Sequence, residues 1–152
     1  MRPILNYTTS IDTLKSVSEI EQKLAEGGAS KIMKEYEGGQ VSGIAFMLKI
    51  DEMEMPFKLP LRAEKVFEIL DKQRRQGKLQ PRFATKEQAH RIGWRILKDW
   101  VEAQLAIIQI GMASPEEVFM PYLYSYERNQ TAFQIAQERG FAKLLPAPER
   151  NP

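Results

Sequence analysis

Residues 40–50 read Gln-Val-Ser-Gly-Ile-Ala-Phe-Met-Leu-Lys-Ile, and their alternation predicts a β-strand. Successive side chains of a strand point to opposite faces of the sheet, so every second residue from Ser42 onward falls on one face. This face is predicted to pack on the core, because most of its members are apolar: Ser42, Ile44, Phe46, Leu48 and Ile50. The other face, which begins at Val41, is expected to point away from the core.

Turn and proline signals around this strand predict a small antiparallel sheet. Gly38-Gly39 is a two-residue hairpin turn that connects it to a preceding strand over residues 30–37. A third strand is predicted over residues 54–60. Pro56 and Pro60 have no backbone N–H to donate, so this third strand is expected to lie at an edge of the sheet or to be very short.

Helices are predicted before and after these strands. Ser16 and Glu19 match a capping box, which predicts a helix that starts there and runs to about residue 26. A second helix is predicted over residues 62–75. Its apolar face consists of Val66, Phe67, Ile69 and Leu70. Residues 4–9 contain Tyr and Thr and are predicted to form a short additional strand.

A long helix is predicted from its N-cap Thr85 to about Gly111, with Gln88 completing a capping box. Its first half is amphipathic, whereas residues 101–112 are apolar on nearly every side. A helix of that kind has to be covered on every side, by the rest of the chain or by a second subunit.

Together these elements predict an α+β fold, in which a small antiparallel sheet packs against two helices and a helical region follows. Ser114-Pro115 and residues 130–139 indicate two shorter helices within that region. The predicted parts are an α+β subdomain (1–76), a basic linker (77–84), a helical subdomain built on the long helix (85–145) and a flexible tail (146–152).

The composition excludes several kinds of functional site. The sequence has no cysteine, which excludes disulfides, thiolate metal sites and cysteine nucleophiles. It has one histidine, His90. Glu87 and His90 have the spacing of a helical metal motif, but di-iron sites need two such motifs, so no metal or other cofactor is predicted. Phosphate-binding glycine patterns and a nucleophile elbow are missing from the sequence, so a non-enzymatic protein is predicted.

No segment of the sequence indicates a membrane. The longest apolar run is far shorter than the roughly 20 residues that span a bilayer. The first residues contain no apolar region of a signal peptide. We therefore expect a cytoplasmic protein without a membrane partner.

Positive charge is concentrated in one segment, although the net charge of the chain is only +2. Residues 71–100 contain nine Lys or Arg and three acidic residues, a local excess of +6. This segment is a candidate footprint for a polyanion, and the alternative is a solvated linker and helix face. The predicted nucleic-acid-binding residues are Lys72, Arg74, Arg75, Lys78, Arg82, Phe83, Lys86, Arg91 and Arg95.

The linker cations are stronger candidates than those of the long helix. No acidic residue lies between Lys72 and Lys86. The helix, in contrast, contains three opposite-charge pairs at i,i+4: Glu87–Arg91, Arg95–Asp99 and Lys98–Glu102. Such pairs neutralise one another on a solvated helix.

The end of the long helix and the segment after it are rich in apolar side chains. Exposed patches of this kind mark oligomer or partner sites, and the alternative is a well-covered core helix. The predicted interface consists of Val101, Leu105, Ile108, Met112, Phe119, Tyr122 and Tyr124. We expect a homo-oligomer, most simply a dimer.

Five short segments are spread over most of residues 4–125. They are Asn6-Tyr7-Thr8-Thr9, Ile32-Met33-Lys34-Glu35-Tyr36, Met55-Pro56-Phe57-Lys58-Leu59-Pro60, the run from Trp94 to Ala106, and Val118-Phe119-Met120-Pro121-Tyr122. Together they resemble an uncharacterised family of small bacteriophage and prophage proteins, which has no assigned activity. The resemblance implies a phage-type protein made in the bacterial cytoplasm, with a role in replication, recombination, transcription control or evasion of host defence.

The predicted function is therefore that of a non-enzymatic, phage-type nucleic-acid-binding protein, an accessory of replication, recombination or transcription. Its binding is expected to be sensitive to salt and mostly independent of sequence. The alternative is an anti-defence protein that neutralises a host protein or sequesters a small nucleotide signal. In that case Arg82 with Phe83, or Arg91 with Trp94, would hold phosphate and base.

Overall fold

In the computed structural model, which describes residues 2–149, strand β2 (Gln40–Ile50) is the middle of a three-stranded antiparallel sheet. Strands β1 (Lys31–Glu37) and β3 (Met53–Lys58) flank it, so Pro56 lies on an edge strand as predicted. The β1–β2 turn places Gly38 and Gly39 at φ values of 57° and 79°, which glycine adopts without strain. With the helices described below, the sheet confirms the predicted α+β class.

The predicted alternation of β2 is wrong near its start. Glu35 pairs with Gly43 and Tyr36 pairs with Val41, so Ser42 is the extra residue of a β-bulge. A bulge interrupts the alternation of faces, and Val41 is buried with 2% of its surface exposed, whereas Ser42 is only half-buried. After the bulge the predicted core face is confirmed, because Ile44, Phe46 and Leu48 are all buried, although Ala45 of the other face is buried as well.

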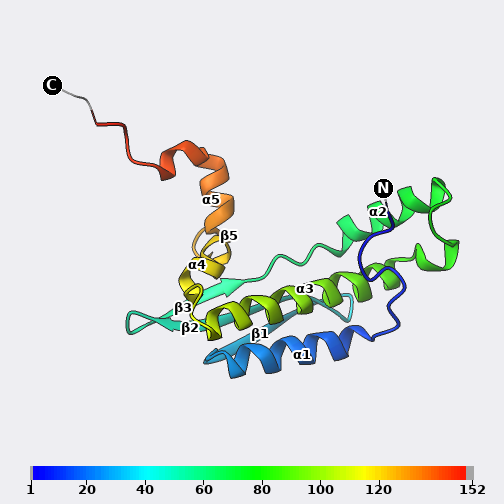
Figure 1. Ribbon diagram of the computed structural model, residues 1–152, viewed down its shortest axis with the longest axis horizontal. Helices are drawn as coiled ribbons and strands as arrows, with labels where there is room; N and C mark the ends of the chain where they lie inside the picture. The colour runs from blue at the N-terminus through cyan, green and yellow to red at the C-terminus, as the bar shows by residue number, and fades with distance from the viewer. Residues whose placement is uncertain (1, 150–152) are drawn as a thin grey trace.

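Two helices share a core with the sheet. The first is the predicted N-terminal helix, but the second is the long helix and not the helix predicted over residues 62–75. Helices α1 (Thr13–Glu26) and α3 (Lys86–Gln109) contribute Val17, Trp94 and other side chains to the cluster that contains Phe46. Helix α2 (Ala63–Arg75) packs mainly on α3, where Leu70 lies in a second cluster with Ala89 and Ile92 (Figure 1). Thus α3 shares its core with the first 76 residues, and the division of the chain at residues 77–84 stays a prediction.

Two capping boxes expected from the sequence do not form. Asp12 is the N-cap of α1, and its side chain accepts a hydrogen bond from the Leu14 N–H. Ser16 lies within the helix and is fully buried. Thr85 does cap α3, as predicted, but the Gln88 side chain turns away from it toward the N-terminal segment.

That N-terminal segment, residues 2–11, is not a strand. It forms turns and irregular chain, held by two buried glutamine side chains. Gln88 donates to the carbonyl oxygens of Tyr7 and Thr9, both at 2.9 Å. Gln73 accepts from the N–H of Ile4 at 3.3 Å. Side-chain amides thus form hydrogen bonds with backbone groups that would pair with a neighbouring strand in a sheet.

The chain after α3 forms a smaller C-terminal part that projects from one end of this helix (Figure 1). Its elements are α4 (Pro115–Phe119), η2 (Met120–Tyr122), β4 (Tyr124–Ser125), β5 (Gln130–Thr131), α5 (Ala132–Arg139) and η3 (Phe141–Leu144). The helix start indicated by Ser114-Pro115 is confirmed, and Ser114 forms a capping box with Glu117 there. The β4–β5 pairing was not predicted, because each strand has only two residues. Residues 146–149 are exposed, and residues 150–152 of the predicted tail lie outside the described residues.

Candidate nucleic-acid interface

The predicted binding segment forms a bend between two helices, which we call the basic elbow (residues 72–86). The last turn of α2 leads through Gly77 and the short 3-10 helix η1 (Pro81–Phe83) into the first turn of α3. The six cations of the elbow are all exposed: Lys72, Arg74, Arg75, Lys78, Arg82 and Lys86. Three of them lie in the last turn of α2, where positive charge interacts favourably with the helix dipole.

Only part of this charge is neutralised within the molecule. Asp71 accepts from Arg74 at 2.8 Å and lies 3.4 Å from Arg75, and the Arg74 hydrogen bond lowers the pKa of this carboxyl. Among residues 2–149, no carboxylate pairs with the other four cations: Lys72, Lys78, Arg82 and Lys86. The elbow therefore carries a net positive charge on its exposed surface.

Phe83 anchors the elbow and is half-buried against the second cluster. Its ring meets that of Tyr7 edge to face, with centroids 5.5 Å apart. The guanidinium carbon of Arg82 lies 4.6 Å from the centroid of the Phe83 ring. Because Tyr7 and Arg82 contact this half-buried ring, the elbow offers mainly charge and little open aromatic surface.

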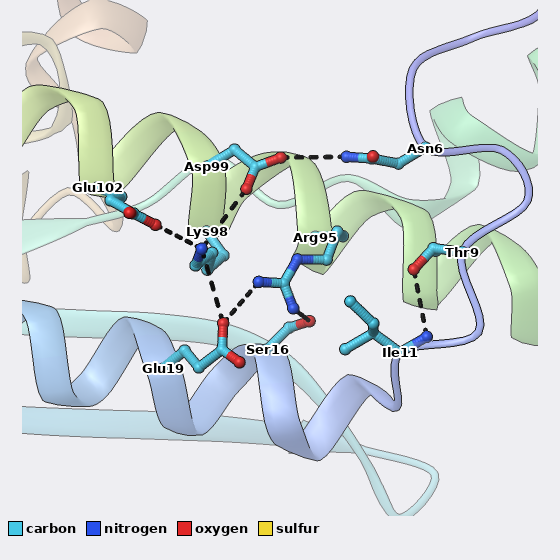
Figure 2. A network of polar contacts seen from close by, with 9 residues as sticks. All are labelled: Asn6, Thr9, Ile11, Ser16, Glu19, Arg95, Lys98, Asp99 and Glu102. Carbon is cyan, nitrogen blue, oxygen red and sulfur yellow. Dashed lines mark hydrogen bonds and ion pairs between the residues drawn. The ribbon is translucent and has the colours of Figure 1, made fainter.

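Two predicted binding residues, Arg91 and Arg95, are engaged inside the molecule. Arg91 donates to Glu87 at 2.7 Å, the predicted i,i+4 pair. Arg95 is only 7% exposed and reaches across to α1, where it donates to Glu19 at 2.5 Å and to Ser16 at 3.4 Å (Figure 2). The predicted Arg95–Asp99 pair does not form, and Asp99 instead accepts from Asn6 at 3.2 Å.

Glu19 is the residue of this network that sequence reasoning missed. It lies 3.7 Å from Lys98 in addition to its bond with Arg95, and Lys98 also pairs with Glu102 as predicted. The Arg95 hydrogen bond lowers the pKa of Glu19, while the hydrogen bond to Glu102 raises the pKa of Lys98. No spacing rule connects positions 19 and 95, so only the packing of α1 on α3 reveals the pair.

The predicted binding of a small nucleotide by Arg91 and Trp94 is not possible in this structure, because Trp94 lies in the core. Trp94 is completely buried, and its indole Nε1–H donates to the Val41 carbonyl at 3.2 Å. It cannot stack on a base beside Arg91.

The structure separates the predicted apolar interface into buried and exposed members. Val101 and Phe119 are completely buried in the core of the chain itself. Met112, in contrast, is 67% exposed, and its neighbour Ile110 is 68% exposed. The remaining members are half-buried: Leu105, Ile108, Tyr122 and Tyr124.

Residues 2–149 contain neither a cluster of metal ligands nor a membrane-spanning helix. No three His, Asp or Glu side chains in this part of the chain come together in a way that could hold a metal ion. None of its helices combines the length and apolar character that crossing a bilayer requires. Comparison of the chain with models of known protein families, with curated protein sequences and with solved structures finds no match.

Proposed function

We propose that the protein binds nucleic acid through the phosphate backbone, at the basic elbow. The observation that supports this is the group of four exposed cations without a carboxylate partner in the described chain: Lys72, Lys78, Arg82 and Lys86. Cations at such a surface displace the counterions condensed on a polyanion, and this release drives binding without base contacts. Arg91 and Arg95 are not part of the proposed surface, because their charges are paired within the molecule.

The elbow favours a duplex over a single strand. Proteins that bind single strands stack the bases on aromatic side chains, and the one aromatic residue of the elbow, Phe83, is half-buried and in contact with Tyr7 and Arg82. Contacts made by lysine and arginine to phosphate alone carry no sequence information. We therefore expect sequence-independent binding that is strongest for double-stranded DNA or RNA.

The resemblance to bacteriophage and prophage proteins supplies the context of the proposal. It is the basis for assigning the protein to the bacterial cytoplasm, as a non-enzymatic accessory of replication, recombination or transcription. We further propose that the protein is a homodimer, joined at the exposed end of α3 near Ile110 and Met112.

Fluorescence anisotropy with labelled duplexes and single strands, at low and physiological salt, tests the elbow. The variant carries Lys72→Ala, Lys78→Ala, Arg82→Ala and Lys86→Ala. It should bind a duplex about 100-fold more weakly at low salt, with a flatter dependence on salt because fewer counterions are released.

The matched control removes four exposed cations elsewhere that also have no carboxylate partner in the described chain: Lys15→Ala, Arg128→Ala, Arg139→Ala and Lys143→Ala. Both variants lose the same formal charge, so a long-range effect of net charge would weaken both equally. If the control loses as much affinity as the elbow variant, or if the elbow variant binds like the wild type, the elbow is not the binding surface.

A further inference from the structure

A second candidate site lies where the segment between β3 and α2 runs along α3 and meets the C-terminal part (Figure 1). Two neighbouring hollows occur there, with volumes of about 410 Å³ and 210 Å³. They share Pro60, Leu61, Arg62 and Tyr122, so they form one continuous surface, which we call the junction groove. Sites of this size at the meeting of two structural parts are typical of small-ligand binding.

The two halves of the junction groove differ in chemistry. The larger half is mainly apolar, with Val66, Ile96, Leu97 and Trp100 among its lining residues. The smaller half is polar and includes Tyr124, Asn129 and Gln134. A ligand that fills both halves therefore has an apolar body at one end and polar groups at the other.

The charged side chains of the lining indicate the charge of the ligand. Lys58, Arg62 and Lys65 line the junction groove, and its lining contains no Asp or Glu. Three other hollows of the described surface all contain carboxylates, for example Glu37 and Glu64 in one of them. The junction groove is thus suited to an anion.

Arg62 is the cation best placed to hold the anionic group. Lys58 pairs with Glu35 at 3.1 Å, and Lys65 lies 3.6 Å from Glu68. No carboxylate in the part of the chain that the structure describes pairs with Arg62, which lines both halves of the groove. Because this guanidinium borders both halves, it can hold a phosphate by parallel hydrogen bonds on the side of the polar half.

We infer that the junction groove binds a nucleoside monophosphate. The base lies in the apolar half beside Trp100, the ribose follows at the boundary of the two halves, and the phosphate binds Arg62 on the side of the polar half. This site is separate from the basic elbow, so it does not depend on the proposed binding of nucleic acid.

Isothermal titration of the full-length protein with 5′-AMP, adenosine and ribose 5-phosphate tests the inference. AMP should bind at least tenfold more tightly than adenosine, which lacks the charge, and than ribose 5-phosphate, which lacks the base. AMP should also quench tryptophan fluorescence through Trp100, because Trp94 is completely buried. Equal binding of the three compounds, or no binding of AMP at millimolar concentration, would overturn the inference.

The variant Arg62→Gln locates the phosphate. Arg62 is exposed and its side chain makes no capping hydrogen bond, so the fold should be retained, which circular dichroism checks. AMP affinity should fall at least tenfold, while duplex binding at the elbow stays unchanged. Arg139→Gln, which changes an exposed arginine outside the groove that also has no carboxylate partner in the described chain, is the matched control and should keep its AMP affinity. If the two variants bind AMP equally well, Arg62 does not hold the phosphate and the inference fails.

Discussion

Arginines of the same helix have different roles according to what lies opposite them. Arg91 pairs with Glu87 of its own helix, a contact that the i,i+4 spacing predicts. Arg95, one turn later, is buried against Glu19 of another helix. The first contact is local and can be predicted from the sequence, whereas the second depends on how α1 and α3 pack.

The pair of Glu19 and Arg95 should contribute measurably to stability. In Glu19→Gln the buried guanidinium loses its counter-charge, so the free energy of unfolding should fall by about 2 kcal/mol. Urea denaturation at pH 7 measures this change. Glu54→Gln is the control: it breaks a pair with Lys31 whose side chains are both exposed, and it should leave the stability within experimental error.

The same pair predicts how stability depends on pH. The pKa of Glu19 is below its ordinary value of 4.5 in the folded protein, so its ionised form stabilises the fold above that value. This stabilisation is lost as the pH falls through the pKa of the folded state. The difference in unfolding free energy between the wild type and Glu19→Gln should therefore be constant near neutral pH and shrink in acid. A difference that grows in acid would contradict the assignment.

At the scale of single elements, the accuracy of the sequence predictions depends on whether the signal is local. The hairpin at Gly38-Gly39 and the helix starts at Thr85 and Ser114 are confirmed, because each signal acts within its own element. The glycines adopt the positive φ of the turn, and Thr85 and Ser114 accept hydrogen bonds from backbone N–H groups of their helices. The bulge at Ser42 and the buried position of Ser16 were not predicted. Both depend on partners distant in sequence: the pairing of β1 in one case and Arg95 in the other.

The N-terminal segment shows how a distant partner replaces a predicted element. Gln88→Leu removes three hydrogen bonds from a buried site: two of 2.9 Å to the carbonyls of Tyr7 and Thr9, and one of 3.1 Å that Arg91 donates to the Gln88 amide oxygen. We expect the free energy of unfolding to fall by about 2 kcal/mol. Relative to the wild type, amide hydrogen exchange should become faster in residues 2–11 and change less in the rest of the chain.

Hydrogen-exchange mass spectrometry measures this effect, with the exposed Gln109→Leu as the control. Unchanged protection of residues 2–11 in Gln88→Leu would mean that the packing of Tyr7 on Phe83, and not the glutamine, holds the segment.

At the scale of the whole molecule, α3 connects the two proposed interaction surfaces. It has 24 residues, which corresponds to about 36 Å at 1.5 Å per residue. The basic elbow lies at its N-terminal end, and the exposed apolar residues Ile110 and Met112 follow its C-terminal end. The sequence predicted this division of charged and apolar character along the helix. Which apolar side chains the chain itself covers could not be predicted, because that depends on the position of α4 and its buried Phe119.

This arrangement predicts a dimer whose two elbows act together. The variant Ile110→Lys with Met112→Lys places charge on the proposed interface, so it should be monomeric where the wild type is dimeric at micromolar concentration in light scattering. The control, Leu14→Lys with Met53→Lys, changes two equally exposed apolar residues elsewhere and should remain a dimer.

The monomeric variant should also bind a long duplex more weakly than the wild type, although its elbow is intact, because two linked sites bind more tightly than one. On a duplex long enough for a single elbow only, the two proteins should have equal affinity. If the wild-type protein is monomeric under these conditions, the dimer is refuted. If the affinity for long duplexes is the same for the dimer and the monomeric variant, the elbows act independently.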